Sequence, residues 1–529
     1  MANDPNILNQ GKPNLDFPNP DTPNLHSGSL PLAWLGPFVL AVGVLGLSSC
    51  GSPRVEELST AGGVRGEAVE LEPCHLSSPG SPGRLEADCG FLILPEDPSN
   101  PEGASLEVHF AVVEAIHRSP HPDPLFLLAG GPGQAAMEAF VSLSGAFAGV
   151  LQKRDLVLVD QRGTGRSNAL TCPEDSLNPL EVPSPEELRA HVDGCREQLS
   201  GDPRFYTTSI AMEDLDAVRE ALGYESINLY GVSYGTRAAL TYLRAFPEHT
   251  RSVVLDGVAP QDLALGETWA RDAQRSFSLI HARCQENEAC GQKFGDLQEV
   301  LSQLLDRLTS SPETVSVDHP TSGESLELTV DGETLAALVH RFSYSPETVS
   351  LLPLLLYEAH ATGDFRRIAA QAVLFQELGL GMSEGMSHAV LCTEDVPFID
   401  LAEARRLNQG TYLGDLQLDQ MSLVCQGWPR GDLRDDYKQP VVSDKPVLLL
   451  SGEADPVTPP EYGDRVAATL SQSLHLVVPG IGHNVLPHGC VPDLVEEFIE
   501  AGSFEGLETS CVEAIEPPPF FLNPSGPNP

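Results

Sequence analysis

Residues 227–243 read Ile-Asn-Leu-Tyr-Gly-Val-Ser-Tyr-Gly-Thr-Arg-Ala-Ala-Leu-Thr-Tyr-Leu, and this stretch decides the fold. A short β-rich apolar run leads into a Gly-x-Ser-x-Gly turn, and a segment with helical periodicity follows the turn. A strand, a tight turn and a helix in this order hold a serine hydroxyl exposed at the tip of the strand, where small flanking residues avoid clashes. The stretch therefore predicts a strand–turn–helix unit with Ser233 as a nucleophile.

The same spacing occurs a second time at residues 381–385, which read Gly-Met-Ser-Glu-Gly. This copy follows a helical run, Ala370–Leu378, instead of a strand. A nucleophile at such a turn needs a strand before it and a helix after it. The sequence context therefore favours Ser233 over Ser383.

Outward from this unit, short apolar runs alternate with helical segments, which is typical of βαβ units and a mostly parallel sheet. Eight strands are predicted, at residues 91–94, 106–113, 125–128, 156–159, 227–230, 253–255, 447–450 and 474–478. Helices are predicted between them at residues 211–222, 236–246, 461–470 and 494–499. We therefore expect the α/β class, with an eight-stranded sheet covered by helices on its faces.

Residues 261–439 break this alternation with long leucine-rich helical segments, such as Leu297–Leu308 and Leu351–His360. An insertion at the carboxyl ends of the strands lies over the edge where such sheets bind ligands, so this segment is predicted to be a helical cap, or lid. The predicted organisation is a leader (1–50), a linker (51–88), a first core part (89–260), the cap (261–439), a second core part (440–511) and a tail (512–529) that is loose after Glu516.

A serine hydroxyl needs a histidine base to become a nucleophile. Among 15 histidines, His483 follows the predicted strand 474–478 through a Pro-Gly-Ile-Gly loop, whose glycines allow a sharp projection over the sheet. His475 lies inside that strand and His488 lies five residues after His483, so both are interpreted as packing or surface residues. His483 is the predicted base.

The histidine in turn needs a carboxylate that fixes its tautomer, and the chain order Ser, Asp or Glu, His points to the loop after the penultimate strand. Asp455 lies in that loop, 28 residues before His483, and Pro456 stiffens the turn. Glu453 and Asp256 are the alternatives. Asp455 is the predicted third member of the triad.

An oxyanion hole requires two backbone N–H groups, one after the nucleophile and one from the loop after the third strand. Tyr234 supplies the first, and Gly131, in the run Ala-Gly-Gly-Pro-Gly at 129–133, is predicted to supply the second; a plain tight turn is the alternative. Residues 160–167 lack the lysine and the helix of a phosphate-binding loop and are interpreted as a buttress beside the site. This chemistry needs neither a metal nor an organic cofactor.

The charge of the 529-residue chain excludes one class of partner. Lys and Arg number 31 against 75 Asp and Glu, a formal net charge of −44. Such a field repels phosphate backbones and anionic lipid surfaces, so nucleic acid is not expected as a partner. A solvated acidic surface is the simplest explanation of the charge.

The first 50 residues are predicted to be an export leader. Residues 1–29 repeat Pro-Asn four times and cannot form a core, and residues 30–47 are apolar and uncharged. Residues 47–51, Leu-Ser-Ser-Cys-Gly, match a bacterial lipoprotein cleavage box, so Cys50 is the predicted lipidation site. The basic residues of an export signal are nearly absent before it, which a start site assigned too far upstream would explain. A membrane-spanning anchor is the alternative, and both place the rest outside the cytoplasm, secreted or in the bacterial envelope.

The cysteines agree with export. Without Cys50 ten remain, an even number, and no CxxC or HExxH pattern offers a metal site. Sequence alone leaves the connectivity open. Our prediction is nearest-neighbour pairing, because each loop is then short: 74–89, 172–195, 284–290, 392–425 and 490–511.

Five motifs together resemble the α/β-hydrolases of the prolyl aminopeptidase and tripeptidyl aminopeptidase type. They are Gly-Gly-Pro-Gly (130–133), Asp-Gln-Arg-Gly-Thr-Gly-Arg-Ser (160–167), Gly-Val-Ser-Tyr-Gly-Thr (231–236), Gly-Glu-Ala-Asp-Pro-Val-Thr-Pro (452–459) and Gly-Ile-Gly-His (480–483). The resemblance covers about residues 89–260 and 440–500. It implies the α/β-hydrolase fold and exopeptidase action at a free N-terminus, with cap carboxylates pairing with the substrate ammonium.

The resemblance is to the exported tripeptidyl branch more than to the cytoplasmic prolyl branch. Ala129 stands where the prolyl branch usually has histidine, which weakens strict proline specificity. In the cap, Cys392-Thr393-Glu394-Asp395 resembles the cysteine-acid segment of the tripeptidyl branch. Glu394 and Asp395 are therefore the expected substrate-binding carboxylates, with a solvated or capping role as the alternative.

Three functions follow from these expectations. The first is an exported, lipid-anchored serine peptidase that cleaves short peptides near a free N-terminus through an acyl-enzyme. The second keeps the same machinery but acts on carboxylic esters or other acyl compounds, since fold and triad do not encode the leaving group. The third is a lipoprotein that binds peptides without turnover. The oligomeric state stays open.

Overall fold

The computed structural model describes residues 62–64, 69–78, 83–173, 181–319, 322–377 and 381–527. All of them belong to one compact unit, Leu58–Pro529. The predicted leader and Cys50 lie outside the described residues. Among the described helices, none combines the length and the apolar character needed to cross a membrane.

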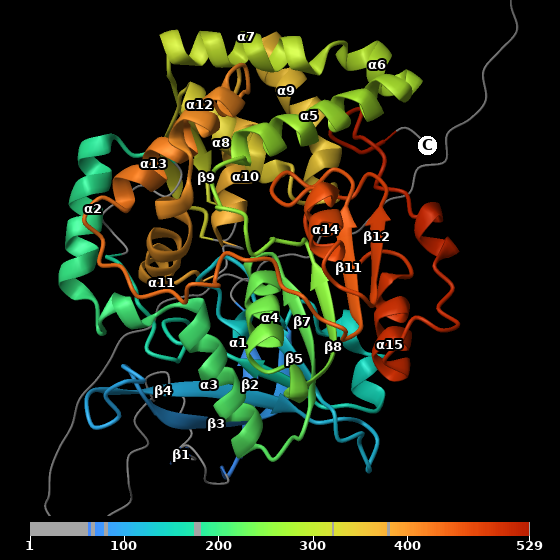
Figure 1. Ribbon diagram of the computed structural model, residues 1–529. Helices are drawn as coiled ribbons and strands as arrows, with labels where there is room; N and C mark the ends of the chain where they lie inside the picture. The colour runs from blue at the N-terminus through green and yellow to red at the C-terminus, as the bar shows by residue number, and fades with distance from the viewer. Residues whose placement is uncertain are drawn as a thin grey trace, which may run out of the picture. The chain divides into compact units, whose positions relative to one another are not determined.

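Ten strands of the described chain form one sheet, in the order β1-β3-β4-β6-β5-β7-β8-β11-β12 with β2 beside β3 (Figure 1). From β6 to β12 all neighbours are parallel, whereas β4 is antiparallel to both of its neighbours. The strands are β1 (Gly62–Val64), β2 (Glu72–Ser77), β3 (Arg84–Pro95), β4 (Ser105–Val113), β5 (Leu125–Leu128), β6 (Leu156–Val159), β7 (Ile227–Val232), β8 (Thr250–Asp256), β11 (Val447–Gly452) and β12 (Ser473–Val478).

All eight predicted strands are present, but the predicted count of eight is corrected to ten. The two additional strands, β1 and β2, lie at the N-terminal end of the chain's described part. Strand β2 buries only Leu76 and joins the sheet by pairing antiparallel with β3. It lacks the apolar run on which the prediction relied.

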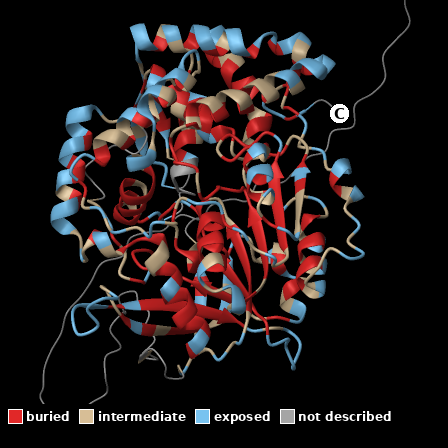
Figure 2. Cartoon of the chain, viewed as in Figure 1, coloured by how far each residue is buried: buried red, intermediate tan, exposed pale blue. Residues whose placement is uncertain are grey.

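Helices cover both faces of the sheet because successive strand residues point to opposite sides. On β7, Leu229 belongs to the apolar core on one face and Tyr230 to the core on the other. Figure 2 shows the central strands almost wholly buried. The first face is covered by α3 (Thr208–Ala221), α4 (Tyr234–Ala245) and α14 (Pro460–Ala467), and the second by α1 (Ala136–Ala139) and α15 (Val491–Ala501).

Between β8 and β11 the chain forms a helical layer with an apolar core of its own (Figure 1). Its helices are α5 (Trp269–Glu286), α6 (Glu288–Phe294), α7 (Leu297–Ser310), α8 (Gly332–Phe342), α9 (Pro346–Thr362), α10 (Arg366–Glu377), α11 (Glu384–Val390), α12 (Leu401–Asn408) and α13 (Leu416–Val424). A hairpin of β9 (Glu313–Asp318) and β10 (Ser325–Val330) was not predicted here. Earlier in the chain, α2 (Pro185–Gln198) packs against α13.

The C-terminal tail packs against the cap, so the prediction of a loose tail is wrong for its described residues. Phe520 and Leu522 are buried in the apolar core of the cap. The backbone N–H of Phe521 donates to the carbonyl of Ser350 in α9 at 2.9 Å. The Arg283 guanidinium stacks over the Phe520 ring at 4.1 Å.

The predicted disulfide connectivity is confirmed at all five pairs. The bonds are Cys74–Cys89, Cys172–Cys195, Cys284–Cys290, Cys392–Cys425 and Cys490–Cys511. Each closes a local loop of 6 to 33 residues. The bonds therefore staple neighbouring elements and do not join distant parts of the chain.

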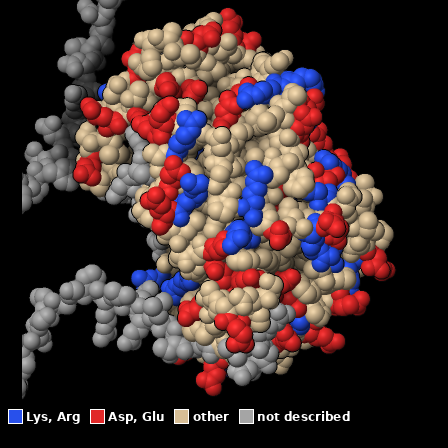
Figure 3. Space-filling view, turned by 60° about the vertical axis from the view of Figure 1, so that its left-hand side comes forward, with Lys and Arg blue, Asp and Glu red and all other residues tan. Residues whose placement is uncertain are grey.

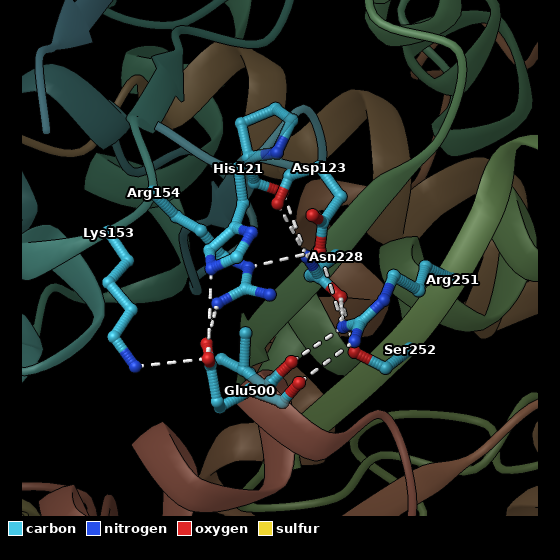
Figure 4. Close-up of polar contacts among 10 residues, drawn as sticks. His121, Asp123, Lys153, Arg154, Asn228, Arg251, Ser252 and Glu500 are labelled. Carbon is cyan, nitrogen blue, oxygen red and sulfur yellow. Dashed lines mark hydrogen bonds and ion pairs between the residues drawn. The ribbon is translucent and has the colours of Figure 1, made fainter. Parts of the chain in front are cut away.

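An ion and hydrogen-bond network closes the amino ends of the central strands (Figure 4). The Asp123 carboxylate, just before β5, accepts from Arg154 at 3.0 Å and from Asn228 at 3.0 Å. Arg154 also donates to Glu500 at the end of α15. Arg251 donates to the Asn228 side chain and to carbonyls of α15. This edge of the sheet is thus joined to α15 by paired polar groups.

The surface charge is mixed in sign despite the large net charge. Figure 3 shows Lys and Arg side chains lying next to Asp and Glu side chains over one face. Arg405, for example, forms ion pairs with Asp415 at 2.7 Å and with Asp419 at 2.6 Å, and it is half exposed. Such pairs reduce the local field of the acidic residues.

Candidate active site

Ser233 lies in a sharp turn between β7 and α4. Its backbone has φ 56° and ψ −125°, a conformation that a non-glycine residue adopts only when its surroundings impose it. A Cβ atom at Gly231 would lie 2.2 Å from the carbonyl oxygen of Gly235, and a Cβ atom at Gly235 would lie 2.2 Å from that of Leu128. Only glycine fits at both positions, so the two glycines of the motif allow the turn to close.

His483 lies in the loop after β12, as predicted, and its ring contacts Asp455. Its Nδ1 lies 2.7 Å from Oδ2 of Asp455, which is fully buried in the loop after β11. The backbone N–H of His483 donates to the carbonyl of Tyr344 at 2.8 Å, and the two rings meet edge to face at 5.3 Å. Tyr344 belongs to the cap, so the cap helps to hold the histidine loop.

The contact between Asp455 and His483 shifts both pKa values. Burial acts to lower the pKa of His483, but the Asp455 carboxylate outweighs it and raises that pKa above its ordinary value. Burial acts to raise the pKa of Asp455, but the His483 ring and the N–H donors of Val457 and Thr458 outweigh it and lower that pKa. The carboxylate therefore stays ionised and stabilises an imidazolium beside it.

Thr458 is a further member of this cluster that sequence reasoning missed. Its hydroxyl donates to Asp455 Oδ2 at 2.8 Å and lies 3.2 Å from His483 Nδ1. The backbone N–H groups of Val457 and Thr458 both donate to Asp455 Oδ1 at 2.8 Å. An aspartate followed within three residues by threonine is a turn pattern that could have indicated this contact.

Ser233 and His483 both lie beside the end of β8. The N–H of Ser233 donates to the carbonyl of Asp256 at 2.8 Å, and a Cβ atom at Gly257 would lie 2.9 Å from Cε1 of His483. No hydrogen bond between the Ser233 hydroxyl and His483 is recorded, although both residues are described. Ser233 and His483 thus lie next to two consecutive residues, Asp256 at the end of β8 and Gly257 after it.

The two alternative carboxylates have other partners. The Asp256 side chain accepts from Val485 and Leu486 N–H groups at 2.9 Å and from the Tyr230 hydroxyl at 2.8 Å. Glu453 accepts from the N–H of Gly480 at 2.8 Å. Both brace the histidine loop, and of the three candidate acids only Asp455 has a recorded contact with the His483 ring.

Two backbone N–H groups are available beside Ser233. A Cβ atom at Gly130 would lie 3.1 Å from Cβ of Ser233, so the loop 129–133 reaches the nucleophile. The N–H of Gly130 is taken by the Gln134 side chain at 3.1 Å, whereas Gly131 is exposed and its N–H has no recorded partner among the described residues. Tyr234 is the first residue of α4, so its N–H has no partner within the helix.

The loop at 160–167 connects residues next to the predicted oxyanion loop with α3. The buried Asp160 accepts from the N–H of Met137 at 2.9 Å and from that of Arg166 at 3.2 Å, and burial raises its pKa to about 6. Arg162 forms a bidentate ion pair with Asp214 of α3, at 2.6 and 2.8 Å. These contacts fit the predicted role of a buttress.

The second Gly-x-Ser-x-Gly motif does not form such a turn. Ser383 precedes α11 and has an ordinary extended backbone, with φ −73° and ψ 97°. Its N–H donates to the carbonyl of Gly133 at 2.9 Å, so this segment of the cap packs against the loop 129–133. Of these two motifs, the one at 231–235 forms a strand–turn–helix unit and the one at 381–385 does not.

Glu394 and Asp395 come together with the core, but both are fully buried. Glu394 accepts from the backbone N–H and the hydroxyl of Thr208, and from the hydroxyl of Tyr437. Asp395 accepts from Arg237 at 2.7 Å and from Lys438 at 3.0 Å. A substrate contact of Glu394 would require its protein donors to be displaced, whereas Oδ2 of Asp395 is buried and has no hydrogen-bond partner among the described residues.

Two other features of the described residues are a surface groove and two clusters with metal-site spacing, and neither indicates a different active site. A groove of about 620 Å³ is lined by the C-terminal tail and by residues near His488, and Ser233 does not border it. Within the described residues, two clusters have the spacing of a metal site, and both include Cys172. Its sulfur is bonded to Cys195, so neither cluster offers a thiolate from that residue.

Comparisons with known proteins bear on the fold and on the class of protein. A family model of the alpha/beta hydrolase fold matches residues 123–279, and a second model, described as TAP-like protein, matches residues 411–511. The chain is an enzyme with the α/β-hydrolase fold. Both matched segments include parts of the site, the first with Ser233 and the second with Asp455 and His483.

Two curated relatives align with most of this chain. Serine protease Hip1 of Mycobacterium tuberculosis is 27% identical over 84% of this chain and 91% of its own. Tripeptidyl aminopeptidase of Streptomyces coelicolor is 24% identical over 82% of this chain and 84% of its own. Among solved structures, proline iminopeptidase of Mycobacterium smegmatis covers 78% of this chain and 98% of its own, at 18% identity and a TM-score of 0.37.

Proposed function

We propose that this α/β-hydrolase is an exported serine peptidase that releases short peptides from a free N-terminus through an acyl-enzyme. The observation that carries the proposal is the contact of Asp455 with His483 beside a serine held in a strained turn. Perturbed groups of this kind cluster where a nucleophile and its base must be poised. The names of the aligned relatives support a peptide as substrate.

In the first half of the reaction, the Ser233 hydroxyl attacks the scissile carbonyl carbon and gives its proton to Nε2 of His483. Asp455 holds the other ring nitrogen and stabilises the imidazolium. The negative charge on the former carbonyl oxygen is bound by the N–H groups of Gly131 and Tyr234. When the C–N bond breaks, His483 gives the proton to the leaving amine, and the N-terminal fragment remains esterified to Ser233.

In the second half, water attacks the ester carbonyl while His483 takes one of its protons. The bond between the carbonyl carbon and Oγ breaks, and His483 returns the proton to Ser233. The released fragment carries a new carboxylate. The chain's own residues supply the nucleophile, the base and the oxyanion donors for both halves.

Export is supported by the five disulfides, which form and persist in oxidising compartments. Lipid attachment at Cys50 rests on the sequence of residues 47–51 and remains part of this proposal. Labelling with a radioactive or clickable fatty acid tests it, because Cys50→Ser should abolish incorporation and release the protein from the membrane fraction.

The activity is tested with a library of unmodified peptides, each paired with its N-acetylated counterpart, and products are identified by mass spectrometry. The proposal predicts cleavage near the N-terminus and loss of cleavage on acetylation. Ser233→Ala should abolish both turnover and labelling by a fluorophosphonate probe, while Ser383→Ala, the matched variant in the second motif, should still take up the probe. Hydrolysis of simple esters with indifference to acetylation would identify an esterase and overturn the peptidase proposal.

A further inference from the structure

One turn of the cap is attached to the helix that follows the nucleophile. Residues Leu391–Asp395 form a π-helical turn, a rare element that is often associated with functional sites. The disulfide Cys392–Cys425 ties the turn to the residue that follows α13. Its last two residues, Glu394 and Asp395, both point into the core and contact groups on or next to α4.

Glu394 sits at the beginning of α3. Its carboxylate accepts from the N–H of Thr208, the first residue of that helix, at 2.6 Å. The free N–H groups and the dipole of a helix N-terminus favour a negative charge there. Burial raises the pKa of Glu394, and the hydrogen bonds donated by Tyr437 and Thr208 oppose part of that rise.

The hydrogen bonds around Glu394 have a defined direction. The Thr208 hydroxyl lies 2.7 Å from Glu394 and 2.7 Å from the hydroxyl of Tyr234. A hydroxyl has one proton, so when Thr208 donates to the carboxylate it accepts from Tyr234, whose other acceptor, Oε1 of Gln161, lies farther away at 3.5 Å. The resulting chain runs from Tyr234 through Thr208 to Glu394, and all three side chains are buried.

Asp395 contacts α4, the helix that begins with Tyr234, one turn after that residue. It accepts from Arg237 of α4 at 2.7 Å and from the N–H of Leu265 at 2.9 Å. Burial acts to lower the pKa of Arg237, but the Asp395 carboxylate outweighs it, so this pKa lies above its usual value. Arg237 in turn donates to the carbonyl of Leu263 at 2.7 Å. The helix is thus held by the cap at both its first and its fourth residue.

We infer that Glu394 is a positioning residue that acts through Thr208 on Tyr234, whose backbone N–H follows the nucleophile. The inference rests on the proposed function, in which that N–H binds the oxyanion. It assigns Glu394 a role in catalysis without contact to the substrate amine.

The physical reason is that an oxyanion donor stabilises the transition state only when it is already aimed at the developing charge. The Tyr234 side chain and its N–H belong to one residue, so fixing the ring limits rotation of the peptide unit beside Ser233. Breaking the hydrogen-bond chain from Tyr234 through Thr208 to Glu394 should therefore lower kcat and leave KM nearly unchanged. It should do so for every acyl substrate, because all of them form the same oxyanion.

The sharpest test compares Thr208→Val with Thr208→Ser. Valine has nearly the shape of threonine but lacks the hydroxyl, whereas serine keeps it. We expect Thr208→Val and Glu394→Gln to lower kcat about tenfold or more, within the range for a weakened oxyanion contact. Thr208→Ser should stay within about twofold of the wild type. Rates are measured on a peptide amide, its N-acetylated form and a p-nitrophenyl ester.

Asp123→Asn serves as the matched control, since Asp123 is also a buried carboxylate with several donors but lies at the opposite edge of the sheet. It should lower thermal stability and leave kcat unchanged. The fluorophosphonate inactivation rate, which also depends on oxyanion binding, should fall with Thr208→Val and not with Asp123→Asn.

Two outcomes would overturn the inference. If Glu394→Gln raises KM only for substrates with a free amine, Glu394 binds the ammonium group instead. If Thr208→Val and Thr208→Ser have equal kcat, the hydroxyl does not position Tyr234. The ester keeps these readouts valid even if no peptide is cleaved, so failure of the peptidase proposal is recognised separately.

Discussion

The two edges of the sheet carry similar side chains with opposite consequences. At the amino edge, Asp123 accepts from Arg154 and Asn228, and the cluster continues into α15 (Figure 4). At the carboxyl edge, Asp455 holds His483, while the Ser233 hydroxyl has no recorded partner among the described residues. The paired groups of the amino edge add rigidity. The Ser233 hydroxyl at the carboxyl edge is free to react with a substrate. The difference predicts that substitutions at one edge change stability and those at the other change rate.

The largest effect is expected for Ser233→Ala. Removing the nucleophile should lower kcat by about 10⁶-fold, because the oxyanion donors and binding alone provide little of the acceleration. The melting temperature should stay close to that of the wild type, because the Ser233 hydroxyl forms no hydrogen bond among the described residues that alanine would remove. Steady-state kinetics and calorimetry on the same preparation measure both, and substantial residual turnover would contradict the assignment.

Asp455→Asn should have the next largest effect, a loss of about 10⁴-fold in kcat. The amide can no longer fix the imidazole tautomer or stabilise the imidazolium. Glu453→Gln, in the same loop, is the control and should retain most of the activity, because the Glu453 carboxylate accepts from the N–H of Gly480 and forms no hydrogen bond with His483, both residues being described. Equal losses in the two variants would argue against Asp455 as the partner of His483.

The pH dependence sharpens the same comparison. His483 must be neutral to accept the serine proton, and its pKa is raised by Asp455 above the ordinary 6.5. The rate constant kcat/KM should therefore be low in acid and rise with pH through an apparent pKa above 6.5. In Asp455→Asn the residual activity should rise at a lower pH, since the carboxylate no longer favours the protonated ring. An unchanged profile in that variant would be incompatible with the contact.

At the other edge, Asp123→Asn should lower the free energy of unfolding by about 2 kcal/mol, because Arg154 loses a buried partner and keeps Glu500. Turnover should remain within about twofold of the wild type. Thermal denaturation and peptide hydrolysis measure the two quantities. A drop in kcat with unchanged stability would show that the two edges are not separable in this way.

The smallest effect is expected on the surface. Arg405→Gln breaks ion pairs with Asp415 and Asp419, but the arginine is half exposed and water screens both pairs. The free energy of unfolding should change by less than about 1 kcal/mol. A larger loss, measured by denaturant unfolding at low and high salt, would mean that the pairs act as a network.

The interior of the sheet could be predicted from sequence because burial on both faces leaves an apolar run, as at Leu125–Leu128. The outer strand β2 could not, since it buries a single residue and is held by main-chain pairing. The hairpin β9–β10 alternates polar and apolar residues, but it lies within a stretch dominated by helical periodicity. Edges depend on partners that a local pattern does not contain.

The same limit applies to the site. Ser233, Asp455 and His483 each lie in a short motif whose loop chemistry can be recognised locally. The role of Glu394 depends on Thr208 and Tyr437, 186 and 43 residues away along the chain. Sequence reasoning found the acidic pair and expected it to face substrate. In the fold both side chains are buried: Glu394 accepts from Thr208 and Tyr437, and Asp395 accepts from Arg237 and Lys438 through Oδ1 alone.

The docked tail adds one more connection between the layers. The chain passes from the core to the cap after β8 and returns before β11, and Phe520 and Leu522 then bring it to the cap a third time. A cap that is connected to the core at three places cannot rotate freely about a single hinge. Movement of the cap away from the core must therefore stretch or release this last connection, and a bulky fusion placed directly after Leu522 should strain it.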